Sequence, residues 1–220
     1  MGVLKEVNFN TLSLNPVSAH REGGLCYHIW SFLSWVVWGL GGLHKLAFQL
    51  SSFDADYGRF LYFGRIVNAF VDLLTAVLIY KIASLLCVEK KWSPLFAVSL
   101  FLITPFEIIY SHYLRTHTFA NFFSMWVLYE SIKLYDNPVP AVYRRIGFAL
   151  GLAIAARYTS ICLTFLPVAI WCCVKEKQWK PGAGTALKFI LGFLLLGFFV
   201  GDPYLFLQYG KAQGPLHFQM

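Results

Sequence analysis

The chain has 220 residues, of which 58% are hydrophobic, 18% aromatic and 13% charged. An average soluble domain is about 45–50% apolar and about 25% charged, so a soluble globule of this size could not bury so much apolar surface. The composition excludes soluble, disordered and disulfide-framework proteins and indicates an integral membrane protein. The net charge of +7 does not indicate a nucleic-acid partner, because the basic residues lie in short loops between apolar runs.

The N-terminal part of the chain is the least regular. The first 24 residues are polar and contain neither a signal peptide nor a transmembrane helix. Residues 25–50 are apolar and rich in tryptophan, so they fit a transmembrane helix and, equally well, a helix lying at the boundary between lipid and water. Residues 51–58 are polar, and we expect a loop there that carries Asp56.

Apolar runs follow in close succession. The first convincing span covers residues 63–86, where Arg65, Asn68 and Asp72 share one helix face. An acid inside a membrane segment is costly unless it faces protein or water, so we expect Asp72 to pack internally with Asn68. Further apolar runs cover residues 92–106, 119–129 and 189–201.

The stretch from residue 146 to residue 174 is apolar except for Arg157. One straight helix of that length would measure about 43 Å, against a hydrocarbon core of about 30 Å. We therefore expect a hairpin of two short helices that is broken near Arg157. The hairpin leaves a clear excess of basic loop residues on one side, which the positive-inside rule assigns to the cytoplasm. The eight on that side are Lys90, Lys91, Lys133, Arg144, Arg145, Lys175, Lys177 and Lys180, against Arg115, Arg157 and Lys211 on the other.

Polar side chains gather at the outer helix ends of this topology. Guanidinium groups at that depth can bind the phosphate of a lipid through charge-assisted hydrogen bonds, and a carboxylate or histidine can act as a general base. Each arginine could instead extend to the lipid headgroups, and the histidines could be ordinary interfacial residues. The residues concerned are Arg65, Glu107, His112, Arg115, His117, Arg157 and Asp202.

Motifs for cofactor or metal chemistry are missing from the sequence. It contains no Cys-x-x-Cys, no His-Glu-x-x-His, no phosphate-binding glycine loop and no nucleophile elbow. We therefore predict no cofactor and leave the use of a divalent metal open. The predicted fold is an all-α, polytopic transmembrane helix bundle with about six spans and an N-terminal amphipathic, interfacial helix. The predicted divisions are 1–62 (partial external loop), 63–207 (transmembrane core) and 208–220 (polar tail).

Five stretches appear in a characteristic order. They are LNP at 14–16, GRIVNAFVDLLTAVLIYKIA at 64–83, TPFEIIYSHYLRTHTFANFF at 104–123, GLAIAARYTSICLTFLP at 151–167 and GDPYLFL at 201–207. Together they resemble the polytopic C-type glycosyltransferases that use lipid-linked sugars, and within these the protein O-mannosyltransferase and aminoarabinose-transferase branch.

The resemblance implies a membrane glycosyltransferase in a prokaryotic plasma membrane. It would transfer a sugar from a polyprenyl-phosphate donor to an unidentified acceptor on the extracytoplasmic side. Basic residues hold the donor phosphate in that family, and Arg65, Arg115 and Arg157 match such positions. Glu107, Asp202 and Tyr204 would complete the outer face.

The first span of that family and its catalytic acid have no counterpart here, so the resemblance implies a fragment. His112, His117 and Asp56 are the candidates left for catalysis. A second hypothesis is a non-catalytic membrane subunit or carrier that binds prenyl-phosphate lipids. A secondary transporter ranks last, because only one broken helix pair is predicted, at the outer face.

Overall fold

A computed structural model of the protein describes residues 53–87, 90–112, 116–173 and 183–202, together with Leu25, Ile29 and Phe32; it does not describe the side chains of residues 53–63, 110–112 and 183. This part of the chain is mostly helical and contains no strand, so the predicted all-α fold is confirmed. The elements are α3 (Phe53–Leu86), α4 (Ser93–Leu102), α5 (Pro105–His112), α6 (His117–Asp136), α7 (Pro140–Ala156), the 3₁₀ helix η1 (Tyr158–Thr164), α8 (Phe165–Cys173) and α9 (Ala183–Gly201).

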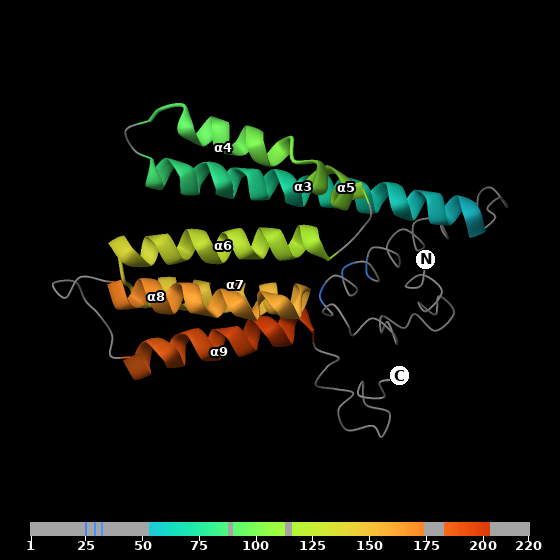
Figure 1. Cartoon of the computed structure of the whole chain (residues 1–220). Coiled ribbons are helices and arrows are strands. Elements are labelled where there is room, and N and C mark those ends of the chain that lie inside the picture. Colours follow the sequence, from blue (N-terminus) through green and yellow to red (C-terminus); the bar gives the residue numbers. More distant parts are fainter. Residues whose placement is uncertain are drawn as a thin grey trace, which may run out of the picture.

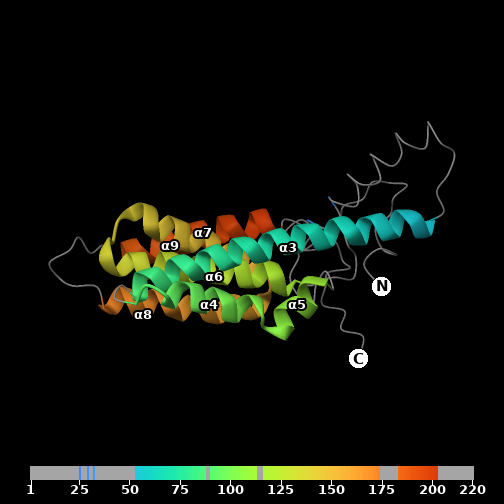
Figure 2. The ribbon, with the colours of Figure 1, turned by 90° about the horizontal axis from the view of Figure 1, so that it is seen from above.

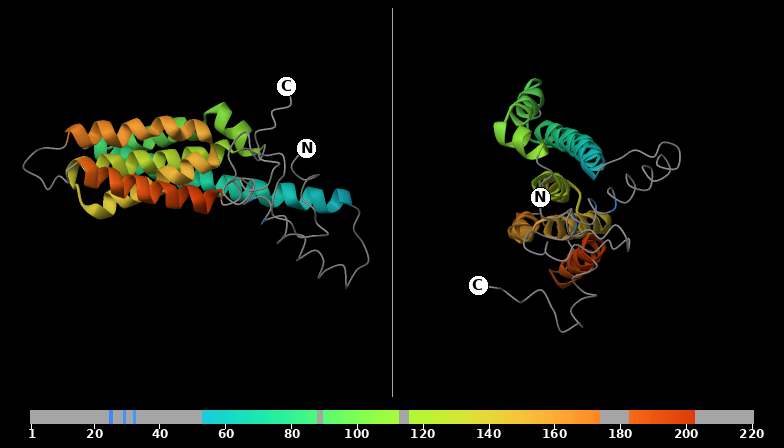
Figure 3. Two further views of the ribbon diagram at one scale, coloured as in Figure 1. Left: turned by 90° about the horizontal axis from the view of Figure 1, so that it is seen from below. Right: turned by 90° about the vertical axis from the view of Figure 1, so that its right-hand side faces the viewer.

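The helices run roughly along one axis and alternate in direction (Figure 1). Helix α6 lies in the middle, with α3 and α4 on one side and α7, α8 and α9 on the other, as the end-on view in Figure 3 shows. Helix α3 is 34 residues long and extends beyond the rest of the bundle at its N-terminal end (Figure 2). Because α3 begins at Phe53, the expected loop at residues 51–58 is wrong from that residue onward.

Prolines mark where several helices start. Pro94 and Pro140 lie in the first turns of α4 and α7, and Pro105 opens α5. Proline suits these positions because the first turn of a helix needs no N–H donor from it. Pro105 also separates α4 from α5, so the predicted apolar run at 92–106 is a broken helix rather than a straight one.

Few of the described helices are long enough to cross a membrane alone. Two helical segments in the described part are long and apolar enough to cross a bilayer: Gly64–Leu86 and Gly184–Gly201. Helices α4 and α8 have ten and nine residues, too few to cross alone. The prediction of about six spans is thus not confirmed.

The predicted hairpin at Arg157 is confirmed. Helix α7 ends at Ala156, and Arg157 takes an extended conformation (φ −156°, ψ 119°) before the chain turns into η1 and α8. The backbone N–H of Arg157 still donates to the carbonyl of Ala153 at 2.9 Å, which closes the last turn of α7. The break therefore follows from the length of the apolar run, which exceeds the thickness of a bilayer.

Helices α7 and α9 pack with their backbones almost in contact. A Cβ added to Gly147 would overlap the carbonyl oxygen of Ile190, and one added to Gly151 would overlap the carbonyl of Leu194. Gly197 on α9 faces the carbonyl of Phe148 in the same way. Small residues four apart allow such close approach, which is a common way for helices to associate inside a membrane.

The remaining core forms along α7, where 12 of 17 residues are buried. Toward the α6 N-terminus, Leu25 and Phe119 pack with Ala155 in one apolar cluster. At the opposite end Tyr143 packs with Leu134. There the partly exposed side chain of Arg145 forms an ion pair with the buried side chain of Glu130 (Nε to Oε2, 3.3 Å). The interfacial-helix prediction falls almost entirely outside the described residues, and the domain limits stay a prediction.

Candidate functional site

Four chain segments meet at one end of the bundle: the start of α6, the end of α7, the start of η1 and the end of α9 (Figure 1). We call it the outer end, because the topology predicted from the sequence places it outside the cytoplasm. The Arg157 guanidinium meets the His117 ring there, with Nη1 2.6 Å from Nδ1. Arginine can only donate, so His117 Nδ1 is the acceptor in this contact. The guanidinium has further N–H groups beyond this one bond, and it is only partly buried.

A second polar contact lies beside the first. Tyr158 follows Arg157 directly, and its hydroxyl donates to Asp202 Oδ2 at 3.3 Å. Asp202 is completely buried at the end of α9, and its backbone N–H donates to the carbonyl of Phe198 at 2.8 Å. The buried Asp202 carboxylate needs a donor such as the Tyr158 hydroxyl, because burial of a carboxylate without hydrogen bonds costs several kcal/mol. The break after α7 thus brings Arg157 against His117 of α6, and Tyr158 against Asp202 at the end of α9.

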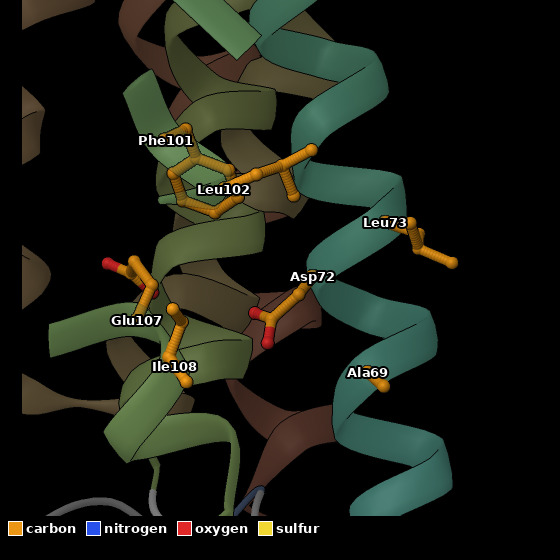
Figure 4. A pocket seen from close by; sticks show the side chains of 7 residues that line it. All are labelled: Ala69, Asp72, Leu73, Phe101, Leu102, Glu107 and Ile108. Carbon is orange, nitrogen blue, oxygen red and sulfur yellow. The ribbon is translucent and has the colours of Figure 1, made fainter. Parts of the chain in front are cut away.

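A third contact connects α5 to α6. Asn121 lies one helical turn after His117, and its Nδ2 donates to Glu107 Oε1 at 2.9 Å. Glu107 also lines a pocket of about 280 Å³ between α3, α4 and α5, into which Asp72 of α3 points from the other side (Figure 4). The expectation that Asp72 packs internally with Asn68 is therefore only half right: Asn68 is completely buried, whereas Asp72 faces this pocket.

The structure brings some of the predicted site residues together. Arg157, His117 and Asp202 lie at one end of the bundle, and Glu107 is tied to the same helix as His117. Arg65 is exposed on α3. Arg115 and Tyr204 lie outside the described residues. Asp56 belongs to α3 and His112 to α5, but the side chains of these two residues are not described. The roles assigned to all these residues stay predictions.

Sequence reasoning missed two members of this region. Asn121 stands four residues after His117, which is the spacing of neighbours on one helix face and could have been used. Tyr158 gave no signal beyond its place next to Arg157. Within the described ranges, no group of three or more His, Cys, Asp or Glu side chains could hold a metal ion.

One family match bears on what this arrangement does. The family described as "GPI transamidase subunit PIG-U" matches residues 41–207, which is 167 of the 220 residues and includes every helix from α3 to α9. No curated protein and no solved structure matches the chain.

This match overturns three predictions. The predicted function, sugar transfer from a lipid-linked donor, is wrong, and so is the predicted enzyme class of glycosyltransferase. The predicted partner, a polyprenyl-phosphate sugar, is wrong as well. The match also gives no support to a prokaryotic plasma membrane. Resemblance in helix order and in polar helix ends describes a membrane topology, and a shared topology does not carry a shared chemistry. The chain is an integral membrane protein, and it belongs to the family of GPI transamidase subunit PIG-U.

Proposed function

We propose that this chain is a non-catalytic transmembrane subunit of a GPI transamidase, acting in the membrane of the endoplasmic reticulum. The observation that carries the proposal is the family match over residues 41–207. A GPI attachment signal consists of small residues at the cleavage site, a polar spacer and a hydrophobic tail that is removed on attachment. The tail and the hydrocarbon chains of the lipid anchor are both apolar, so a membrane-embedded subunit could bring them to the catalytic machinery.

The outer surface of the bundle fits a component of that kind. Large apolar side chains on α3 and α9 are half exposed or more, among them Phe70 (60%) and Leu187 (59%). Such exposure would be a liability in water but is ordinary against lipid or a neighbouring transmembrane helix. The closely packed interface of α7 and α9 provides a rigid frame for this surface.

The polar outer end suggests a role toward the lipid. We propose that Arg157 binds a phosphate of the anchor lipid, since its guanidinium is partly exposed and has N–H groups beyond its bond to His117. Arg65 and Arg115 are proposed for the same role from their sequence positions. The buried Tyr158–Asp202 contact would hold the chain on either side of Arg157 in place.

The test is a depletion experiment in the native host. A secreted reporter with a GPI attachment signal is followed after the chain is removed, and a second reporter with an uncleaved transmembrane anchor is the matched control. We expect the GPI reporter to accumulate with its hydrophobic tail still attached while the control reaches the surface normally. A tagged copy of the chain should co-purify with the transamidase. Normal GPI attachment after depletion would contradict the proposal.

If attachment fails on depletion, single variants then test the site. Arg157→Gln should lower attachment of the GPI reporter by about tenfold, because removal of one charge-assisted contact costs about 1.5–3 kcal/mol. Arg144→Gln is the control, because Arg144 lies at the opposite end of the bundle against the rings of Phe189 and Phe193. Equal attachment with both variants would leave Arg157 without a role in lipid binding.

A further inference from the structure

The pocket between α3, α4 and α5 holds two carboxyl groups that the proposed function does not use. Asp72 on α3 and Glu107 on α5 both line it, and its remaining walls are apolar (Figure 4). Those walls are formed by Ala69, Leu73, Phe101, Leu102 and Ile108.

The pocket lies beside a candidate membrane span. Asp72 is eight residues inside the candidate span Gly64–Leu86, which corresponds to about 12 Å along the helix axis. A carboxyl group that far inside a membrane span would lie below the level of the lipid headgroups. Ionisable residues in such places are costly and usually meet a partner of opposite charge or a polar interior.

Neither carboxyl has a cationic partner within the described part of the chain. Glu107 Oε1 accepts from the neutral amide of Asn121, at 2.9 Å. Asp72 Oδ1 is buried and accepts no hydrogen bond. The next described base on α3, Lys81, instead lies 6.0 Å from the centre of the Tyr129 ring. Two acidic groups thus face one small space without a neutralising charge.

The rim of the pocket is open toward the surroundings of the bundle. Leu73 is 58% exposed, Leu102 45% and Ile108 48%. Along α3, Ala69, Leu73 and Val77 are exposed at intervals of four residues, so they form an apolar stripe that leads past the pocket. A stripe of this kind matches the side of another transmembrane helix.

We infer that this pocket is the docking site for a transmembrane helix of another subunit of the complex, which inserts a lysine or arginine side chain between Asp72 and Glu107. The inference rests on the proposed function. The charge requirement selects a basic side chain, and the depth selects one carried by a transmembrane helix rather than the amine of a lipid headgroup. Two carboxylates and one amide also offer fewer oxygen ligands than Ca²⁺ takes, and their apolar surroundings leave little room for the waters that Mg²⁺ retains.

The first test removes the charges and keeps the shape. The double variant Asp72→Asn/Glu107→Gln is expressed as the tagged full chain in the native host, and the other transamidase subunits recovered with it in mild detergent are quantified. We expect recovery to fall at least about tenfold, because a basic side chain left buried without its partner is strongly unfavourable. Asp136→Asn, an exposed acid at the far end of α6, is the control and should recover the complex as the wild type does.

A folding defect is distinguished from a docking defect by size-exclusion chromatography and thermal unfolding of each variant chain. The double variant should elute and unfold as the wild type does. Unaltered recovery of the complex with the double variant would overturn the inference, and so would a loss of recovery that is matched by a loss of the folded chain.

The second test identifies the helix. A photo-crosslinking amino acid is placed at Leu73, and at Leu187 on α9 as a control for general lipid exposure. We expect Leu73 to yield a peptide from a predicted transmembrane helix that contains Lys or Arg. Asp72→Lys should then abolish assembly, and replacement of that basic residue by Asp should restore it. Crosslinks to lipid alone, or to a helix without a basic residue, would overturn the inference.

The two proposals fail differently. If the wild-type chain assembles with the transamidase and the double variant does so equally, the docking site is wrong and the proposed function stands. If the crosslinked helix carries a basic residue but belongs to a protein outside the transamidase, the proposed function is wrong and the docking site stands.

Discussion

The two sides of the bundle are built differently. On one side, α7 and α9 approach so closely that the glycines at Gly147, Gly151 and Gly197 leave no room for a Cβ. On the other side, α3 meets the short helices α4 and α5 around a pocket of about 280 Å³ with two carboxyl groups. The α7–α9 interface stabilises the fold of the chain itself. The pocket between α3, α4 and α5 instead has exposed apolar side chains and two carboxyl groups, which we propose bind another molecule.

The largest effect is expected from a substitution that fills the closely packed side. Gly197→Leu places a side chain against the backbone of Phe148 and should destabilise the chain by about 3 kcal/mol or more. Gly192→Leu, five residues earlier on the same helix, meets nothing within 4 Å and is the matched control. The measurement is the recovery of monodisperse chain from detergent after heating. Equal recovery of the two variants would mean that α7 and α9 do not rely on this contact.

The next effect concerns the buried acid Glu130, at the opposite end of the bundle from His117 and Arg157. Arg145→Ala leaves Glu130, whose side chain is 4% exposed, without its ion-pair partner at 3.3 Å. We expect a loss of about 1–3 kcal/mol in the free energy of unfolding, since a buried acceptor left unpaired is costly. Adding Glu130→Gln should recover part of that loss. If the double variant is less stable than Arg145→Ala alone, the ion pair does not explain the effect.

A smaller effect is expected at the outer end. Tyr158→Phe removes the hydrogen bond to Asp202 and keeps the ring, so stability should fall by about 1 kcal/mol. Thermal unfolding is the readout. Tyr80→Phe is the control, because Tyr80 lies 46% exposed on α3. An equal loss of thermal stability in both variants would show that the Tyr158–Asp202 hydrogen bond does not stabilise the chain more than an exposed tyrosine hydroxyl does.

The smallest effect on stability belongs to the open side. Leu73→Ala should change the free energy of unfolding by no more than about 0.5 kcal/mol, because the side chain is 58% exposed. The same variant should lower recovery of the complex if a partner helix packs there. A clear loss of stability would show that α3 needs Leu73 for its own fold.

The sequence predicted those features of the fold that follow from a bilayer. The length of the apolar run at 146–174 required a break, and the structure has it at Arg157. The all-α class followed from composition alone. The count of spans did not follow as well, because Pro105 divides one predicted run and the chain after Arg157 starts as a 3₁₀ helix, so that several apolar runs are not single long helices.

The candidate site was only partly within reach of the sequence. His117, Arg157 and Asp202 were expected at one end because topology puts their helix ends there, and the structure brings them together. The meeting of Asp72 with Glu107 depends on how α3 packs against α5 across 35 positions of sequence, which no local pattern reports. The predicted sugar transfer was wrong for another reason, because polar residues at helix ends near a membrane surface are compatible with many functions.

Transamidation by isolated membranes tests the central claim most directly. Membranes depleted of the chain are supplied with a reporter precursor that carries a GPI attachment signal, and purified chain is then added back in detergent–lipid mixtures. Membership in a GPI transamidase predicts that the lipid-anchored product is lost on depletion and returns with the wild-type chain, while Gly197→Leu restores none of it. Full product formation by the depleted membranes would contradict the account.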